Sequence, residues 1–180
     1  MLSAWLWVAW LVYWNVAAIF VQRTRSSEGL GSRLKHVLPL YVGAVLIFHG
    51  RPWIGAWLYE GKAVGYVGNL LTAAGLGFTV WARLWLGRYW SGFITIKEGH
   101  RLIRGGPYRL VRHPIYTGIL TGLLGSAISA ATFDALVGFG VIAAGLLFKI
   151  GREEAVLIGE FGEEYRKFKA EVPALVPLVY

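Results

Sequence analysis

The 180-residue sequence contains no cysteine and few charged residues. Without cysteine the chain can form no disulfide, thiolate-bound zinc site, iron–sulfur cluster or catalytic thiol. Its four histidines are scattered, so no histidine-based metal centre is expected. Charged residues make up only 16% of the chain and hydrophobic residues make up 56%, whereas soluble domains average about 25% charged residues. This composition argues against a disordered chain, a collagen-like chain and a soluble enzyme, and it indicates a membrane protein.

Acidic residues are the scarcer of the two charge types. The chain has 18 Lys and Arg against 10 Asp and Glu, which gives a net charge of +8. In a soluble chain this excess could indicate nucleic-acid binding. In a chain this apolar it is more typical of basic loops beside an anionic membrane face. We therefore expect membrane lipids as partners, with no nucleic acid and no metal.

Apolar runs predict an all-α integral membrane protein with about five transmembrane helices, because a bilayer core of about 30 Å needs roughly 20 apolar residues in a helix. The first run has no basic segment before it and is too long for a cleaved signal peptide, so it is interpreted as a retained span. The second run is interrupted at Arg51-Pro52, and only Asp134 separates the last two, which predicts a tight hairpin. The runs are 2–21, 37–50 with 53–59, 63–82, 114–133 and 135–148.

The distribution of Lys and Arg predicts the orientation, since cytoplasmic loops are enriched in these residues. The loop after the first span and the loop between the third and fourth are basic, whereas the opposite side has only Arg51 and Lys62. The N-terminus is therefore expected outside, with the C-terminus and any active site in the cytoplasm. Arg83 and Arg88 could contact a substrate, but lipid headgroups are favoured for both.

Small residues recur at helical spacing on two of the predicted spans, which predicts close packing of helix backbones. They are Gly68, Thr72, Gly75 and Thr79 on the third span, and Gly118, Gly122, Ser126 and Ala130 on the fourth. After the fifth span, residues 150–172 predict a cytoplasmic amphipathic helix, interrupted near Gly159 or Gly162. We expect one membrane domain over 1–180, in which 1–82 holds three spans and 83–180 forms a cofactor-binding catalytic region.

Polar residues concentrate in 83–117 and again from Lys149 onward. If the last two spans form a tight hairpin, His113 and Tyr116 should face Lys149 and the pair Glu153-Glu154. Pro114 is a natural first helical residue, which leaves the backbone N–H groups after it available to an anion. Ionisable groups this close to a bilayer are costly to bury, so a binding site is expected here. The alternative is that these charges only anchor the chain at the membrane surface.

The order and spacing of these residues resemble the isoprenylcysteine carboxyl methyltransferase family and its wider relatives among the membrane phospholipid methyltransferases. The resemblance covers roughly residues 80–177. Its motifs are LGRYWS at 86–91, GPY at 106–108, RHPIY at 112–116, REE at 152–154 and FGEEY at 161–165.

The resemblance implies an integral-membrane enzyme that uses S-adenosyl-L-methionine in a pocket between the last spans, the preceding loop and the C-terminal helix. It assigns the catalytic roles to Lys149, Arg152 and Glu153. The cofactor-binding residues that it implies are His100, Leu102, Gly106, Tyr108, Arg112, His113, Pro114, Tyr116, Glu153 and Glu154. In this scheme the glutamates accept hydrogen bonds from the amine or ribose diol, and Arg112 and His113 hold the carboxylate.

The acceptor is less well defined than the cofactor. Family members with carboxyl activity often have Arg where this chain has Lys149, and Lys cannot grip a carboxylate bidentately. Glu171 also stands where the family often has Arg. A lipophilic small molecule or lipid is expected as acceptor. The open alternatives are a phospholipid N-methyltransferase, an NADPH-dependent membrane reductase and a non-catalytic small transporter or scaffold.

Overall fold

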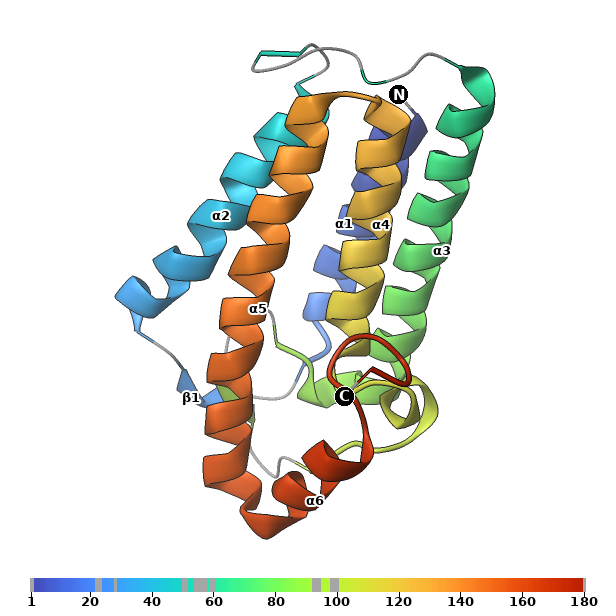
Figure 1. Cartoon of the computed structure of the whole chain (residues 1–180). Coiled ribbons are helices and arrows are strands. Elements are labelled where there is room, and N and C mark those ends of the chain that lie inside the picture. Colours follow the sequence, from blue (N-terminus) through green and yellow to red (C-terminus); the bar gives the residue numbers. More distant parts are fainter. Residues whose placement is uncertain are drawn as a thin grey trace.

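The structure is a computed structural model that describes residues 2–179, except 22–23, 28, 50–51, 54–57, 59–60, 92–94 and 98–100. Helices dominate the described residues and run side by side as a bundle (Figure 1). The helices are α1 (Leu2–Ala18), α2 (Leu30–Phe48), α3 (Lys62–Leu86), α4 (Pro114–Ala130), α5 (Phe133–Phe161) and α6 (Glu163–Glu171). The described residues also form two 3₁₀ turns, η1 (Gly87–Tyr89) and η2 (Gly106–Arg109). They form two strands as well, β1 (Thr24–Ser27) and β2 (Thr95–Lys97).

Among the described helices, α3 and α5 have the length and apolar composition to cross a membrane. Shorter apolar helices are α1, Val37–Phe48 within α2, and α4. The second predicted span starts earlier than expected, since α2 begins at Leu30 and carries Pro39 inside it. Most of 53–59 lies outside the described residues, so the expected continuation of this span stays a prediction.

Helices α3 and α4 pack backbone against backbone through their small residues. A Cβ placed on Gly75 would lie 2.4 Å from the backbone nitrogen of Gly122, and one on Gly68 would lie 2.5 Å from the carbonyl oxygen of Gly125. The buried hydroxyl of Thr72 donates across the same contact to the Gly122 carbonyl at 3.1 Å. The packing that the small-residue stripes predict is confirmed.

We expect Gly75→Ala to lower the melting temperature in detergent by about 5 °C, because overpacking a tight contact costs about 1–3 kcal/mol. Gly77→Ala is the matched control on the same helix, since a Cβ there has nothing within 4 Å. Thermal unfolding followed by circular dichroism measures both. Equal melting temperatures for the two variants would contradict the α3–α4 contact described here.

The turn between α4 and α5 is short and lies at the end of the bundle far from α6 (Figure 1). Ala131 adopts the left-handed conformation and Thr132 caps α5 by accepting a hydrogen bond from the N–H of Ala135. Asp134, expected between the spans, instead belongs to the first turn of α5. There it is fully buried and meets the imidazole of His49 at 3.1 Å, which ties the end of α2 to the start of α5.

The segment 150–172 is not one separate amphipathic helix. Its first part continues α5 through Gly159 to Phe161, and the chain turns at Gly162, which has φ of 55°. At 29 residues, α5 is about 44 Å long. It is therefore longer than an apolar layer of about 30 Å.

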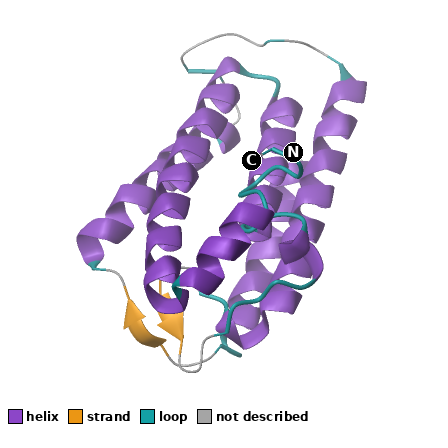
Figure 2. Ribbon diagram, turned by 60° about the horizontal axis from the view of Figure 1, so that its bottom comes forward, coloured by secondary structure: helices purple, strands orange, loops and turns teal. Residues whose placement is uncertain are grey.

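Strands β1 and β2 form a small antiparallel sheet that the all-α expectation did not include. The sheet joins the loop before α2 to the loop before α4, at the same end of the bundle as α6 and the C-terminal segment (Figures 1 and 2). The short polar run TRSS of β1 has none of the alternation that predicts a strand. The sheet places both basic loops at one end, as their charge predicts.

Candidate active site

A cavity of about 290 Å³ opens at the end of the bundle that carries η1, η2 and α6. Its polar wall comes from the segment before α4, the first turns of α4 and the second half of α5. Its apolar wall comes from α1, α2 and the middle of α5. The lining includes Trp14, Leu40, Leu86, Tyr89, Trp90, Ser91, Arg101, Leu102, Tyr108, Arg112, His113, Pro114, Tyr116, Ile119, Leu146, Lys149, Glu153, Leu157, Tyr165 and Phe168.

The Gly105-Gly106-Pro107 turn positions the start of this polar wall. A Cβ on Gly106 would lie 2.4 Å from the indole of Trp85, and Gly106 has φ of 57°. Both facts require glycine, because a side chain would clash with the ring and strain the backbone. The turn thus presses against the end of α3, and Tyr108 follows it into the buried wall of the cavity.

Two phenols in the lining remain protonated at neutral pH. Burial raises the pKa of Tyr108 far above its usual range, and the nearby carboxylate of Glu153 acts in the same direction. Burial likewise raises the pKa of Tyr165, again with help from neighbouring carboxylates. Both side chains therefore stay neutral, and a neutral phenol can donate its O–H as well as accept a hydrogen bond.

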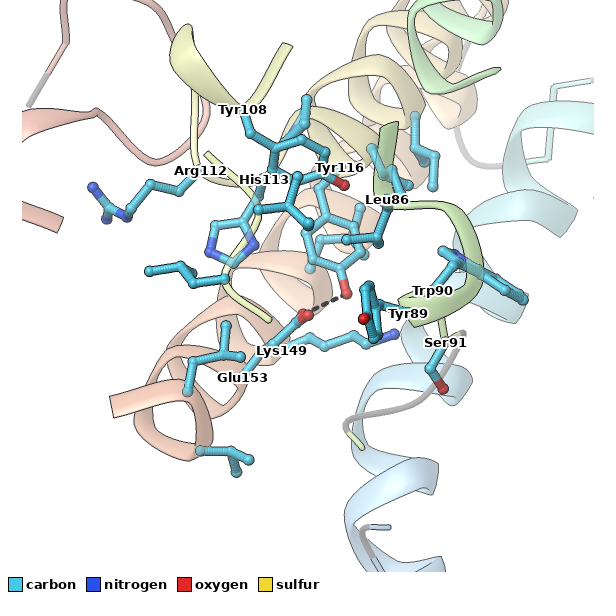
Figure 3. Close-up of a pocket in the computed structure, with 18 of the residues that line it drawn as sticks. Leu86, Tyr89, Trp90, Ser91, Tyr108, Arg112, His113, Tyr116, Lys149 and Glu153 are labelled. Atoms are coloured by element: carbon cyan, nitrogen blue, oxygen red, sulfur yellow. Dashed lines mark hydrogen bonds between the residues drawn. The ribbon is translucent and has the colours of Figure 1, made fainter. Parts of the chain in front are cut away.

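Glu153 and Tyr116 form the central polar contact of the cavity. The hydroxyl of Tyr116 donates to Oε2 of Glu153 at 2.7 Å, and the ring of Tyr116 stacks against His113 with centroids 5.6 Å apart (Figure 3). The Nζ of Lys149 lies 5.4 Å from the centre of the Tyr116 ring, and its side chain is buried. A carboxylate, a cation and two aromatic rings therefore meet in one place.

Glu154 follows Glu153 directly in the chain, but its carboxylate belongs to a different cluster of charged side chains. Its Oε1 accepts from Nε and Nη2 of Arg112, both at 2.8 Å, and lies 3.2 Å from Nε2 of His113. Its Oε2 accepts from Nζ of Lys169 on α6 at 2.6 Å. Glu154 is only 5% exposed. This carboxylate joins α5, the start of α4 and α6, and it is not among the residues that line the cavity.

The C-terminal segment lies along the start of α4. The backbone N–H groups of Arg112 and His113 donate to the carbonyls of Pro173 and Ala174 at 2.8 and 3.0 Å. The hydroxyl of Thr117 donates to the carbonyl of Leu175 at 2.7 Å. Carbonyl groups of the chain itself therefore bind the two N–H groups immediately before Pro114, whereas the sequence favoured the N–H groups after Pro114 for an anion.

The structure brings together most of the residues that the sequence assigned to the site. Leu102, Tyr108, Arg112, His113, Pro114, Tyr116, Lys149 and Glu153 line the cavity. The aliphatic part of the Arg112 side chain lines the cavity, while its guanidinium points away from Tyr116 and Glu153 (Figure 3). Gly106 and Glu154 lie beside the lining, and Arg152 is exposed to solvent on α5. His100 lies outside the described residues.

The sequence assignment omitted the apolar half of the lining. Trp14, Val37 and Leu40 come from the first 82 residues, outside the expected catalytic region, and no motif marks them. Tyr89, Trp90 and Ser91 belong to the LGRYWS motif, so a signal for them was present. Within the described ranges, no three His, Asp or Glu side chains gather as a metal site.

Comparison with known proteins gives one family match. The model of the "Isoprenylcysteine carboxyl methyltransferase (ICMT) family" matches residues 68–159. This range includes α4, most of α3 and nearly all of α5, which together carry Tyr116, Lys149 and Glu153.

Several curated proteins are similar to the chain. The protein-S-isoprenylcysteine O-methyltransferase of Schizosaccharomyces pombe is 28% identical over 131 residues, which cover 68% of this chain and 51% of that protein. A probable enzyme of the same name from Oryza sativa subsp. indica is 29% identical over 98% of this chain and 97% of its own length. Methanethiol S-methyltransferase 1 of Bradyrhizobium diazoefficiens is 36% identical over 70 residues, or 39% of this chain and 24% of that protein.

Proposed function

Because the chain belongs to the isoprenylcysteine carboxyl methyltransferase family and is a methyltransferase, we propose that it methylates the carboxylate of a prenylated cysteine. The observation that carries this proposal is the two-sided cavity. The Tyr116–Glu153 pair and Lys149 form its polar side, and Trp14, Leu40 and Leu146 form its apolar side. A polar methyl donor and a lipid-bearing acceptor need such a combination.

The polar side fits S-adenosyl-L-methionine by the chemistry of its donors and acceptors. Glu153 would accept from the amine or the ribose diol, and the protonated phenol of Tyr108 would donate to an acceptor group. His113, held between Tyr116 and Glu154, would complete this wall. When bound, the cofactor supplies an electrophilic methyl group on a sulfonium. Because Glu154 is already bound by three side chains, we assign cofactor contact to Glu153.

Lys149 is the cation placed to orient the acceptor carboxylate. Its side chain is buried in the cavity wall, and a carboxylate nucleophile needs alignment and exclusion of water but no general base. Arg152 is exposed on the outer side of α5, so we assign it to lipid headgroups. The isoprenoid of the acceptor would lie against the apolar side. The acceptor that we propose is therefore a lipidated cysteine, more specific than the lipophilic small molecule expected from the sequence.

We also propose that the bundle crosses the membrane five times, with the site at the cytoplasmic face. Helices α1 to α5 supply the spans, and a helix of 17 residues, as in α1 and α4, reaches about 26 Å. The basic segments around β1 and β2 lie at the end that carries the cavity, which supports a cytoplasmic position for this end and the C-terminus.

Transfer of a labelled methyl group tests the proposed function. We expect detergent-purified protein to move the label from S-adenosyl-L-methionine to N-acetyl-S-farnesyl-L-cysteine as an alkali-labile ester. Phosphatidylethanolamine should receive none. Lys149→Met should raise KM for the prenylcysteine by about tenfold or more, because it removes a charged hydrogen-bond donor, while Lys149→Arg should retain activity. Label in the phospholipid, or binding of NADPH in place of the methyl donor, would contradict the proposal.

A further inference from the structure

Arg83 is buried in the last turn of α3 and turns toward the protein. Only 5% of the residue is exposed, so it does not meet lipid headgroups as the sequence favoured. One Nη donates to the carbonyl of Ala17 at the end of α1 at 2.8 Å, and the other donates to the carbonyl of Gly87 in η1. Arg83 therefore ties the end of α1 to the turn that leaves α3.

The same guanidinium lies over the ring of Trp90, which itself pairs with a second indole. Its Cζ is 4.8 Å from the ring centre of Trp90, within the range of a cation–π contact. Trp90 meets Trp14 of α1 edge to face, with centroids 5.2 Å apart and an interplanar angle of 85°. Trp14 in turn stacks on Trp10, whose indole N–H donates to Thr79 of α3 at 2.6 Å. The indole pair is thus held from both sides.

Trp14 and Trp90 both line the cavity. Trp90 stands across the cavity from His113 and Glu153 (Figure 3). Trp14 belongs to the apolar side, together with Leu40, Ile119 and Leu146. Through Trp14, this pair therefore borders the part of the cavity that suits a hydrocarbon chain.

We propose that the Trp14–Trp90 pair determines which length of isoprenoid the site accepts, and that Arg83 is a positioning residue that holds the pair in place. This inference rests on the proposed function. A buried guanidinium is costly in an apolar bundle and is retained where its contacts are needed. Here the Nε of Arg83 has no hydrogen-bond acceptor among the described residues. The contacts that explain its burial are those to α1, η1 and Trp90.

The geometry implies a direction for the effect. The two indoles are large and rigid, and each removes volume from the apolar side of the cavity. Removing either ring should make room for a longer chain. Removing Arg83 should have the same effect by releasing Trp90, but it should add little once Trp90 is absent, because residues that act through one another are not additive.

The test uses N-acetyl-L-cysteine carrying S-geranyl, S-farnesyl or S-geranylgeranyl groups as methyl acceptors for the 180-residue protein. For Trp14→Ala, Trp90→Ala and Arg83→Gln we expect the ratio of kcat/KM for the geranylgeranyl acceptor to kcat/KM for the geranyl acceptor to rise about fivefold or more. One methylene group in an apolar pocket can by itself change kcat/KM by about tenfold. KM for S-adenosyl-L-methionine should stay within about twofold of wild type. The double variant Arg83→Gln/Trp90→Ala should match Trp90→Ala alone.

Trp5→Ala is the matched control, since Trp5 lies on the same helix as Trp14, is 72% exposed and does not line the cavity. If an alanine variant or Arg83→Gln does not fold, Trp14→Phe, Trp90→Phe and Arg83→Lys replace them, with smaller shifts in the same direction.

Each of the following results would overturn the inference. An equal loss for all three acceptors would show a merely structural role, and a raised KM for the methyl donor would place the indoles beside the cofactor. Additive effects of Arg83 and Trp90 would show that Arg83 does not act through the indole. If the wild type methylates none of the three acceptors, the proposed function is wrong and this inference falls with it. If it methylates them and the variants leave the ratio unchanged, only the inference is wrong.

Discussion

Glu153→Gln should lower kcat/KM for methyl transfer about 100-fold and leave the melting temperature unchanged. The carboxylate of Glu153 faces the cavity and accepts from Tyr116 at 2.7 Å. Glutamine can still accept that hydrogen bond, so the fold should persist. It carries no charge for the amine of the cofactor, and losing a hydrogen bond to a charged group costs about 1.5–3 kcal/mol. Calorimetric binding of S-adenosyl-L-methionine and initial rates measure the effect.

The control for this change is Glu164→Gln. Glu164 is exposed on α6 and does not line the cavity, so the same chemical substitution there should leave binding and turnover within about twofold of wild type. The assignment of Glu153 to the cofactor would be wrong if Glu153→Gln bound the methyl donor normally. It would also be wrong if both glutamine variants lost activity equally.

Glu154→Gln should destabilise the protein around α6 instead of removing a cofactor contact. The substitution leaves the buried guanidinium of Arg112 facing an amide, and it weakens the contacts with His113 and Lys169. Breaking a buried ion pair by changing one partner costs about 3–5 kcal/mol. We expect hydrogen exchange of the α6 amides to accelerate about 100-fold, because opening of this segment becomes about 3 kcal/mol easier.

Glu171→Gln provides the comparison for Glu154. Glu171 pairs with Arg104 at the surface, where the two side chains are 60% and 39% exposed. Surface pairs of this kind contribute about 0–1 kcal/mol, so exchange on α6 should change by less than about fivefold. Unchanged α6 protection in Glu154→Gln, together with lost donor binding, would show that Glu154 belongs to the cofactor site.

The two predictions separate neighbouring residues that the sequence treats as a pair. Consecutive residues of an α-helix point about 100° apart, so Glu153 and Glu154 cannot face the same group in the same way. Periodicity alone therefore predicts that the two carboxylates point in different directions. It cannot say which one faces the cavity, because that depends on how α5 is rotated against α4 and on where α6 docks.

Much of the helical layout could be predicted from the sequence because its causes are local. Apolar runs have the length that a bilayer requires, and the glycine spacing on α3 and α4 matches the helical repeat, so the backbone contact at Gly75 and Gly122 could be expected. The residue at which α5 ends could not be predicted from the sequence. Gly159 and Gly162 are equivalent breakers in the sequence, and only Gly162 adopts a positive φ at the turn into α6.

The sequence by itself determined the apolar helical composition, the small-residue faces and the motifs that hold Tyr116 and Glu153. Each of these depends on residue type and on spacing within one segment. Only the tertiary structure decided that Trp14 and Leu40 complete the cavity, that Arg83 faces inward and that Glu154 binds Arg112 and Lys169. These contacts join residues far apart in the chain, and they depend on how whole helices rotate and dock against one another.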